Sequence, residues 1–175
     1  IRVGGMNSGT GYNWQIKANC SSIGSSYEQT NLSTICPDPS ALTSSNIGTT
    51  EATFSWNSAR NGIYYWVQYK TSSSSTWSTA VIEFSNSYTL TGLNAGTSYD
   101  FRIQTKCMVN NSSYLSATFT TLCNEATQLI TKSTTSNSAV VSWNQSIGST
   151  NYTVDYKTGS SSTWTSAGTT TDTSK

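Results

Sequence analysis

The chain has 175 residues, with nine Lys and Arg, eight Asp and Glu and no His, so its formal net charge is +1. So small a charge, without a basic cluster, excludes the electrostatic pattern of proteins that bind nucleic acids or anionic membranes. The lack of His excludes Ser-His-Asp, Cys-His and HExxH sites built from this chain alone. No apolar run approaches the roughly 18 residues of a membrane-spanning helix. We therefore expect no nucleic-acid partner and no membrane insertion.

An internal repeat of 87 residues, the offset that carries Tyr12 onto Tyr99, organises the chain. The alignment needs no gap. We predict that residues 36–122 form one complete unit, preceded by the C-terminal part of a unit in 1–35 and followed by the N-terminal part of another in 123–175. Further identical pairs under this offset are Gly9 and Gly96, Cys20 and Cys107, Cys36 and Cys123, Trp56 and Trp143, Tyr65 and Tyr152, and Trp77 and Trp164.

Apolar residues alternate with polar ones along the complete unit, which is the period of a half-buried strand and not of a helix. Clusters of Ser, Thr, Asn and Gly, such as residues 71–76, separate the alternating runs and predict turns. The chain is therefore predicted to be all-β, with its strands in a two-sheet sandwich. The alternating residues are Ala52, Phe54 and Trp56; Tyr65, Val67 and Tyr69; Tyr99, Phe101 and Ile103; and, less regularly, Tyr114, Ala117 and Phe119.

The segment TLTGLNAGTSY at residues 89–99, followed by DFRIQTKC, resembles strand E, the E–F turn and strand F of a fibronectin type III domain. The resemblance implies that Tyr99, and Tyr12 in the preceding repeat, form tyrosine corners. Trp56 and Trp143 resemble the core Trp of strand B. By the same resemblance, residues 1–35 supply strands E, F and G, and residues 123–175 supply strands A, B, C and C′.

Fibronectin type III units are in general non-catalytic spacers or adhesive modules, so the resemblance implies no catalytic residue, no cofactor and no bound metal. The paired Cys and the Trp after a Ser-rich turn are similar to tandem repeats of long secreted and cell-surface proteins of gliding bacteria. We therefore expect an extracellular stalk or adhesive fibre. Its expected partners are neighbouring repeats, other copies of the protein, or a surface polysaccharide or protein. The alternative is an accessory spacer or carbohydrate-binding region of a secreted hydrolase.

Four Cys permit three pairings. In the fold that the resemblance implies, Cys107 ends strand F and Cys123 follows strand G, which puts their sulfurs roughly 20 Å or more apart. Cys36 begins strand A at the end of the sandwich where strand F finishes, so we predict a Cys36–Cys107 disulfide and an oxidising, extracellular setting. Cys20 and Cys123 are left to pair with neighbouring units or chains. In a continuous array these units are covalently joined, whereas real chain ends would give a head-to-tail polymer linked from Cys123 to Cys20.

Two aromatic residues are candidates for contact with a ligand or partner. If Tyr65 and Val67 face the core, Tyr64 and Trp66 must face outward. Exposed rings of this kind can form a sugar-stacking or protein-docking surface. The alternative is that they lie under a neighbouring loop or domain.

Two carboxylates and two further Trp residues are also candidates. Asp100, which alternates outward, and Glu83, on a neighbouring segment, suggest a glycosidase-like pair. The next unit has Thr170 in place of Glu83, and no apolar pocket pattern would raise a carboxyl pKa, so both are interpreted as solvated. Trp77 and Trp164 each follow an SSSTW turn, and their recurrence favours a structural role at the sheet edge.

Overall fold

The computed structural model describes residues 1–175, which form 13 strands and no helix. The chain divides into two compact units. The first unit contains Ile1–Asn46, Ala52–Leu90 and Ser98–Phe119, and the second contains Ile47–Glu51, Thr91–Thr97 and Thr120–Lys175. The predicted all-β fold class is confirmed.

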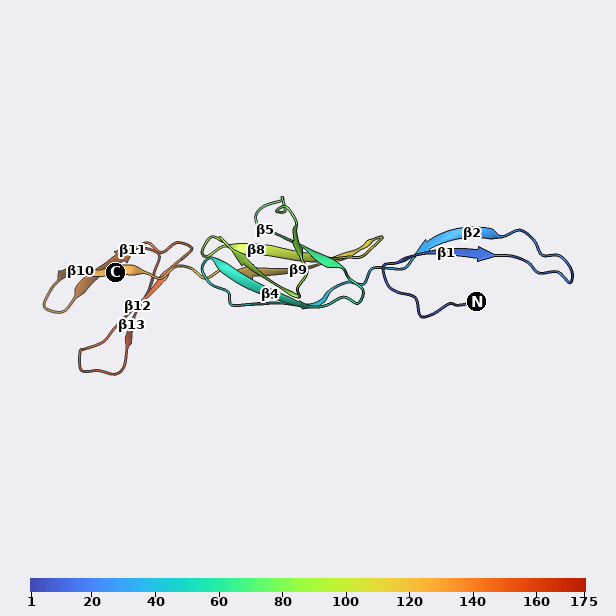
Figure 1. The fold of residues 1–175 in the computed structure, drawn as a ribbon. Helices are drawn as coiled ribbons and strands as arrows, with labels where there is room; N and C mark the ends of the chain where they lie inside the picture. Colours follow the sequence, from blue (N-terminus) through green and yellow to red (C-terminus); the bar gives the residue numbers. More distant parts are fainter. The chain divides into compact units, whose positions relative to one another are not determined.

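A two-sheet sandwich makes up most of the first unit (Figure 1). One sheet has the order β3-β4-β7, and the other has the order β6-β5-β8-β9. Neighbouring strands pair antiparallel, as between β5 and β8, where Trp66 faces Gln104 and Gln68 faces Arg102. The strands are β3 (Ser40–Ser45), β4 (Glu51–Asn57), β5 (Tyr64–Thr71), β6 (Val81–Glu83), β7 (Ser87–Thr91), β8 (Ser98–Lys106) and β9 (Asn111–Thr120).

The core of the sandwich is built from the alternating residues of β4, β5 and β8. Phe54 and Phe101 are fully buried, and their rings stack with centroids 3.8 Å apart. Phe119 meets Phe54 edge-on at 5.0 Å, and Trp56 meets Tyr65 edge-on at 5.3 Å. Burying one such side chain stabilises the fold by about 1.5–3 kcal/mol, so these few rings supply much of the hydrophobic stabilisation in a chain that is only 34% hydrophobic.

A disulfide joins Cys36 and Cys107, as predicted, with their Cα atoms 5.8 Å apart. The bond spans 71 residues of sequence and ties the segment before β3 to the end of β8. The Cys107 N–H donates to the Asn110 carbonyl in the turn that leads to β9. Cys20 and Cys123 are exposed free thiols.

The N-terminal residues of the first unit form a hairpin of β1 (Gly11–Ile16) and β2 (Glu28–Ser33). The Asn7 N–H donates to the Tyr12 hydroxyl over 2.8 Å, which is the predicted tyrosine corner. No strand precedes β1 in the residues where strand E was expected. In the complete sandwich the corresponding strand, β7, pairs with β4, and residues 1–35 contain no equivalent of β4.

Two strand pairs occupy the second unit. β10 (Thr127–Thr134) pairs with β11 (Ala139–Asn144), and β12 (Tyr152–Tyr156) pairs with β13 (Thr165–Thr170). By the repeat offset they correspond to β3, β4, β5 and β6. Trp143 meets Tyr152 edge-on at 5.2 Å, and the Ser146 N–H donates to the Tyr152 hydroxyl over 2.9 Å. Both contacts repeat those of Tyr65, whose hydroxyl accepts from the Ala59 N–H over 3.0 Å.

Hydrogen bonds of the E–F turn also recur at the repeat offset. The Thr10 N–H donates to Thr34 Oγ1 over 3.0 Å, and the Thr97 N–H donates to Thr121 Oγ1 over 3.0 Å. Each acceptor hydroxyl in turn donates to a backbone carbonyl of its own turn. The sequence repeat is therefore a repeat of local structure.

Candidate binding face

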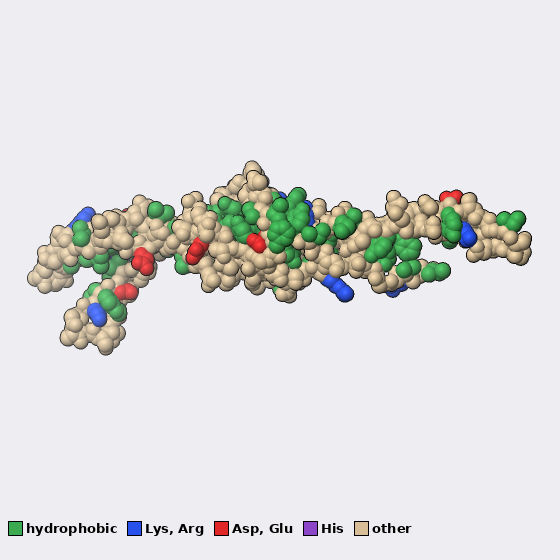
Figure 2. Space-filling model, viewed as in Figure 1, with side chains coloured by type: hydrophobic (Ala, Val, Ile, Leu, Met, Phe, Trp, Pro, Cys, Tyr) green, Lys and Arg blue, Asp and Glu red, His purple; other side chains and the backbone are tan.

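The outward side of β5 and β8 carries the candidate residues. We call it the outer face and define it by Tyr64, Trp66, Gln68 and Lys70 on β5 and Asp100, Arg102, Gln104 and Lys106 on β8. Core and outward positions alternate along both strands, which places these eight side chains on one side of the sheet. Hydrophobic side chains reach the surface around this part of the sandwich (Figure 2).

Tyr64 and Trp66 are both half-buried. The Nζ atom of Lys106 lies 3.1 Å from the centroid of the Trp66 ring, so the Lys106 amine covers one face of that ring. The Tyr64 ring is tilted against Phe84 with centroids 5.9 Å apart, and Phe84 itself is 74% exposed. The two rings therefore lie on the outer face as partly covered side chains, packed against residues of their own sandwich.

Lys106 is a buried cation, with only 3% of the residue exposed. Its Nζ donates to Gln104 Oε1 over 2.9 Å, and no carboxylate lies within ion-pair distance. Burial lowers the pKa of the Lys106 amine, because the charged form loses hydration. The Trp66 ring and the Gln104 amide replace part of that hydration.

Arg102 lies between two aromatic rings. Its Cζ atom is 4.0 Å from the centroid of the Trp77 ring and 4.0 Å from that of the Tyr114 ring. Trp77 comes from the loop between β5 and β6, and Tyr114 comes from β9, so the rings approach from opposite sides of β8. Gln68 Oε1 accepts hydrogen bonds from Arg102 Nε (3.1 Å), Arg102 Nη2 (2.8 Å) and the Tyr114 hydroxyl (3.1 Å). We call these four residues the Arg102 clamp.

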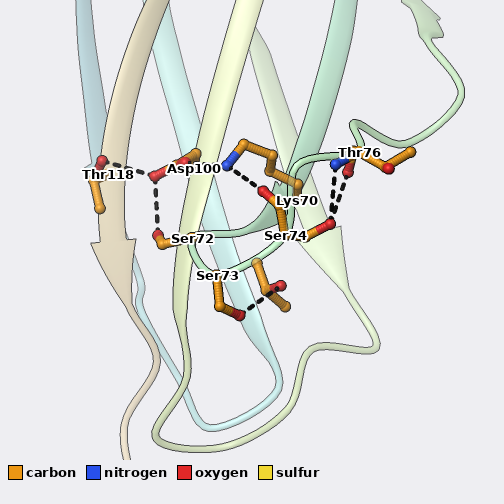
Figure 3. A network of polar contacts seen from close by, with 8 residues as sticks. Lys70, Ser72, Ser73, Ser74, Thr76, Asp100 and Thr118 are labelled. Carbon is orange, nitrogen blue, oxygen red and sulfur yellow. Dashed lines mark hydrogen bonds and ion pairs between the residues drawn. The ribbon is translucent and has the colours of Figure 1, made fainter.

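Asp100 belongs to a separate polar network at the far end of the outer face (Figure 3). Its carboxylate pairs with Lys70 Nζ at 2.7 Å and accepts from Ser72 Oγ at 2.9 Å and Thr118 Oγ1 at 3.1 Å. Hydrogen bonds hold the pKa of Asp100 below its ordinary value, and the bond from Lys70 has the largest effect, ahead of that from Ser72. Lys70 also donates to the Ser74 carbonyl, so the network anchors the start of the loop that carries Trp77.

The structure does not pair Glu83 with Asp100. Glu83 accepts from the Ser85 N–H over 2.8 Å, and that hydrogen bond lowers the pKa of Glu83. A glycosidase acid needs a raised pKa, and both carboxyl groups are shifted the other way.

The recurring Trp residues each contact a Lys near the end of the preceding strand. Lys70 Nζ lies 5.4 Å from the Trp77 ring centroid, and Lys157 Nζ lies 5.0 Å from that of Trp164. Trp77 is half-buried over the outer face, whereas Trp164 is 61% exposed. The further contact of Trp77 with Arg102 was missed from the sequence, where the only available signal was an outward Arg opposite Gln68.

The outer face presents cations and aromatic rings. No group of three or more Cys, Asp and Glu side chains is placed to hold a metal ion. No helix is long and apolar enough to cross a membrane. The outer face can therefore provide stacking, cation–π contacts and charge.

Comparison with known proteins agrees with this architecture. Residues 37–121 match the family model of the fibronectin type III domain. This part of the chain has the fibronectin type III fold. No curated protein matches the chain significantly.

Three solved β-sandwich structures are similar to parts of the chain. A two-domain segment of chicken tenascin is 24% identical, with a TM-score of 0.61 over 67% of this chain and 68% of that one. A redesigned β-sandwich protein is 27% identical, with a TM-score of 0.48 over 50% of this chain and 92% of that one. A domain of human collagen alpha-1(XX) is 19% identical, with a TM-score of 0.49 over 53% of this chain and 91% of that one. The tenascin segment therefore shares its fold with this domain.

Proposed function

We propose that this chain is a non-catalytic segment of a repetitive extracellular protein, in which fibronectin type III domains act as an extended stalk or adhesive fibre. The observation that carries the proposal is the gap-free repeat, whose turn hydrogen bonds and Trp–Tyr contacts recur in successive copies. A unit that repeats with its internal contacts unchanged suits a structure that gains length by adding units.

The Cys36–Cys107 disulfide supports a location outside the cytoplasm, since disulfides persist in oxidising compartments. A surface rich in Ser and Thr and carrying few charges fits the same location. The sequence resemblance favours a secreted or cell-surface protein of a bacterium.

The partners in this proposal are neighbouring repeats, other copies of the protein, and a surface polysaccharide or protein. Cys20 and Cys123 are the repeat equivalents of Cys107 and Cys36, and both are exposed free thiols. In the proposed array Cys123 pairs with the Cys that corresponds to Cys107 in a neighbouring unit or chain, and Cys20 pairs with the Cys that corresponds to Cys36.

Antibodies raised against the purified 175-residue chain test this proposal on intact cells of the source organism. We expect surface labelling that external protease removes, together with secreted or shed antigen in the medium. Labelling that appears only after lysis would contradict the extracellular stalk. Sequencing the coding region on both sides of the chain separates a stalk, with many more repeats, from the accessory region of a hydrolase.

A further inference from the structure

We propose that the Arg102 clamp is a binding subsite for the carboxylate groups of an acidic polysaccharide. The inference rests on the proposed adhesive function and names a ligand class for it.

The guanidinium of Arg102 is fixed before any ligand arrives. Two rings contact it at 4.0 Å, and the paired hydrogen bonds to Gln68 Oε1 fix its rotation. A free Arg side chain loses much conformational entropy when it is ordered by a ligand. In the clamp, folding of the domain already orders the Arg102 side chain, so binding of a ligand does not lose this entropy.

The charge of Arg102 is not neutralised by the protein. Its hydrogen-bond partner is an amide, and the nearby carboxylate of Asp100 is paired with Lys70 at 2.7 Å. Lys106, the other cation of this strand face, also has an amide partner and no carboxylate. Arg stays protonated at any physiological pH, so the outer face carries two uncompensated positive charges.

The free edge of the guanidinium suits a planar carboxylate. Nε and one Nη2 hydrogen are engaged by Gln68, whereas Nη1 donates to no protein atom and Arg102 remains partly exposed. With both rings 4.0 Å from Cζ, the N–H groups of the free edge are the donors left for an anion. A carboxylate can accept two parallel N–H bonds in the guanidinium plane.

Gln68 is the residue that keeps this charge available. Glu has nearly the same shape and would form an ion pair with Arg102, and the equivalent position of the next unit holds an acid, Asp155. The amide fixes the guanidinium with two hydrogen bonds and leaves its charge for an external anion.

The rings beside the clamp favour a sugar polymer over an acidic peptide. Tyr64 and Trp66 are half-exposed on the same face, and Trp66 lies one position along β5 from Gln68 on that side. Such amphipathic rings stack on the apolar faces of pyranose units. The repeat equivalents of Tyr64, Trp66 and Arg102 are Asn151, Thr153 and Gln15, so the subsite belongs to the complete domain alone.

The test measures binding of the 175-residue chain to polygalacturonate and alginate, with fully methyl-esterified pectin as the uncharged control. Dextran sulfate and poly-L-glutamate test other anions. We expect binding to at least one uronate polymer, weakened by salt, and none to the esterified pectin. Arg102→Gln should weaken binding roughly tenfold or more, because a charged bidentate contact is lost. Lys132→Gln, which removes one exposed positive charge elsewhere, should change it by less than about twofold.

Gln68→Glu keeps Arg102 and both rings and replaces only the amide. It should weaken uronate binding roughly tenfold, because the new carboxylate neutralises Arg102 internally. The variant also loses the hydrogen bond from Gln68 Nε2 to the Ser78 carbonyl (2.8 Å), so a cooperative thermal transition must show that it is folded. Failure of the parent to bind either uronate polymer, or parent-like binding by Arg102→Gln and Gln68→Glu, would overturn the subsite. If dextran sulfate binds as tightly as the uronate polymers and its binding depends on Arg102, the carboxylate assignment is wrong. If poly-L-glutamate binds as tightly as the uronate polymers, the polysaccharide assignment is wrong. Surface labelling of cells is independent of Arg102, so either proposal can fail alone.

Discussion

The Lys106 amine lies 3.1 Å from the centroid of the Trp66 ring, in a residue that is only 3% exposed. A cation in this position loses part of its hydration, and here a ring and an amide take the place of an ion-pair partner. Its charge therefore opposes folding while its aliphatic stem packs on the sheet.

Replacing this cation should cost little. We expect Lys106→Met to change the free energy of unfolding by less than about 1 kcal/mol at pH 7, because relief of desolvation offsets the lost cation–π contact. The folded-state pKa of Lys106 is lowered, so the unfolded chain binds its proton more tightly and the parent gains stability as the pH rises toward 10.5. Urea denaturation at pH 7 and pH 10 should show this gain in the parent and in Lys132→Met, but not in Lys106→Met. An equal gain in Lys106→Met would contradict the assignment.

Asp100 should confer the opposite pH dependence. The hydrogen bonds from Lys70 and Ser72 lower the pKa of Asp100 in the folded state. Asp100 therefore stabilises the fold at pH values above its ordinary pKa of 3.8, and this stabilisation is lost as the pH falls below 3.8 through the folded-state pKa. We expect Asp100→Asn to be less stable than the parent at pH 7 and to show a smaller loss between pH 5 and pH 2. Thermal denaturation across this range checks it, with Asp172→Asn as an exposed control.

Removing the disulfide should strongly destabilise the domain. We expect the double variant Cys36→Ala, Cys107→Ala to lose about 4 kcal/mol of unfolding free energy, the amount expected for closing a long loop. The matched double variant Cys20→Ala, Cys123→Ala removes two exposed free thiols and should unfold like the parent. Mass spectrometry of a non-reduced digest should show Cys36 joined to Cys107, and a Cys107–Cys123 peptide would refute the pairing.

The Tyr65 hydroxyl should contribute a measurable hydrogen bond. Tyr65→Phe leaves the Ala59 N–H without its acceptor, so we expect a loss of about 1 kcal/mol in unfolding free energy. Tyr88→Phe removes a hydroxyl with no protein partner and should lose less than half of that. Equal effects in the two variants, measured by urea denaturation, would show that the Ala59 bond contributes nothing.

The sequence predicted the sandwich because the alternation of apolar residues and the 87-residue repeat can both be recognised in a single sequence. Phe54 and Phe101 fall on the core side from alternation alone, and the Cys36–Cys107 pair follows once the strands are ordered. The Arg102 clamp was beyond such reasoning. It depends on how the loop carrying Trp77 folds back over β8, which no period in the sequence encodes.

The partial burial of Trp66 was also beyond sequence reasoning. Alternation correctly predicted that the Trp66 ring faces outward, but it did not indicate that the Lys106 amine lies over one face of that ring. A long flexible side chain can either extend into solvent or lie down on its neighbours, and packing in three dimensions decides between them.

The hydrogen bonds shared by Thr10–Thr34 and Thr97–Thr121 have a consequence for inheritance. Since each copy closes its own turn with its own residues, unequal recombination between copies of the gene can insert or delete a whole repeat without breaking any of these bonds. In the proposed array, alleles are therefore expected to differ in copy number between individuals of the source species, so that the length of the stalk is a heritable trait that changes in steps of one domain.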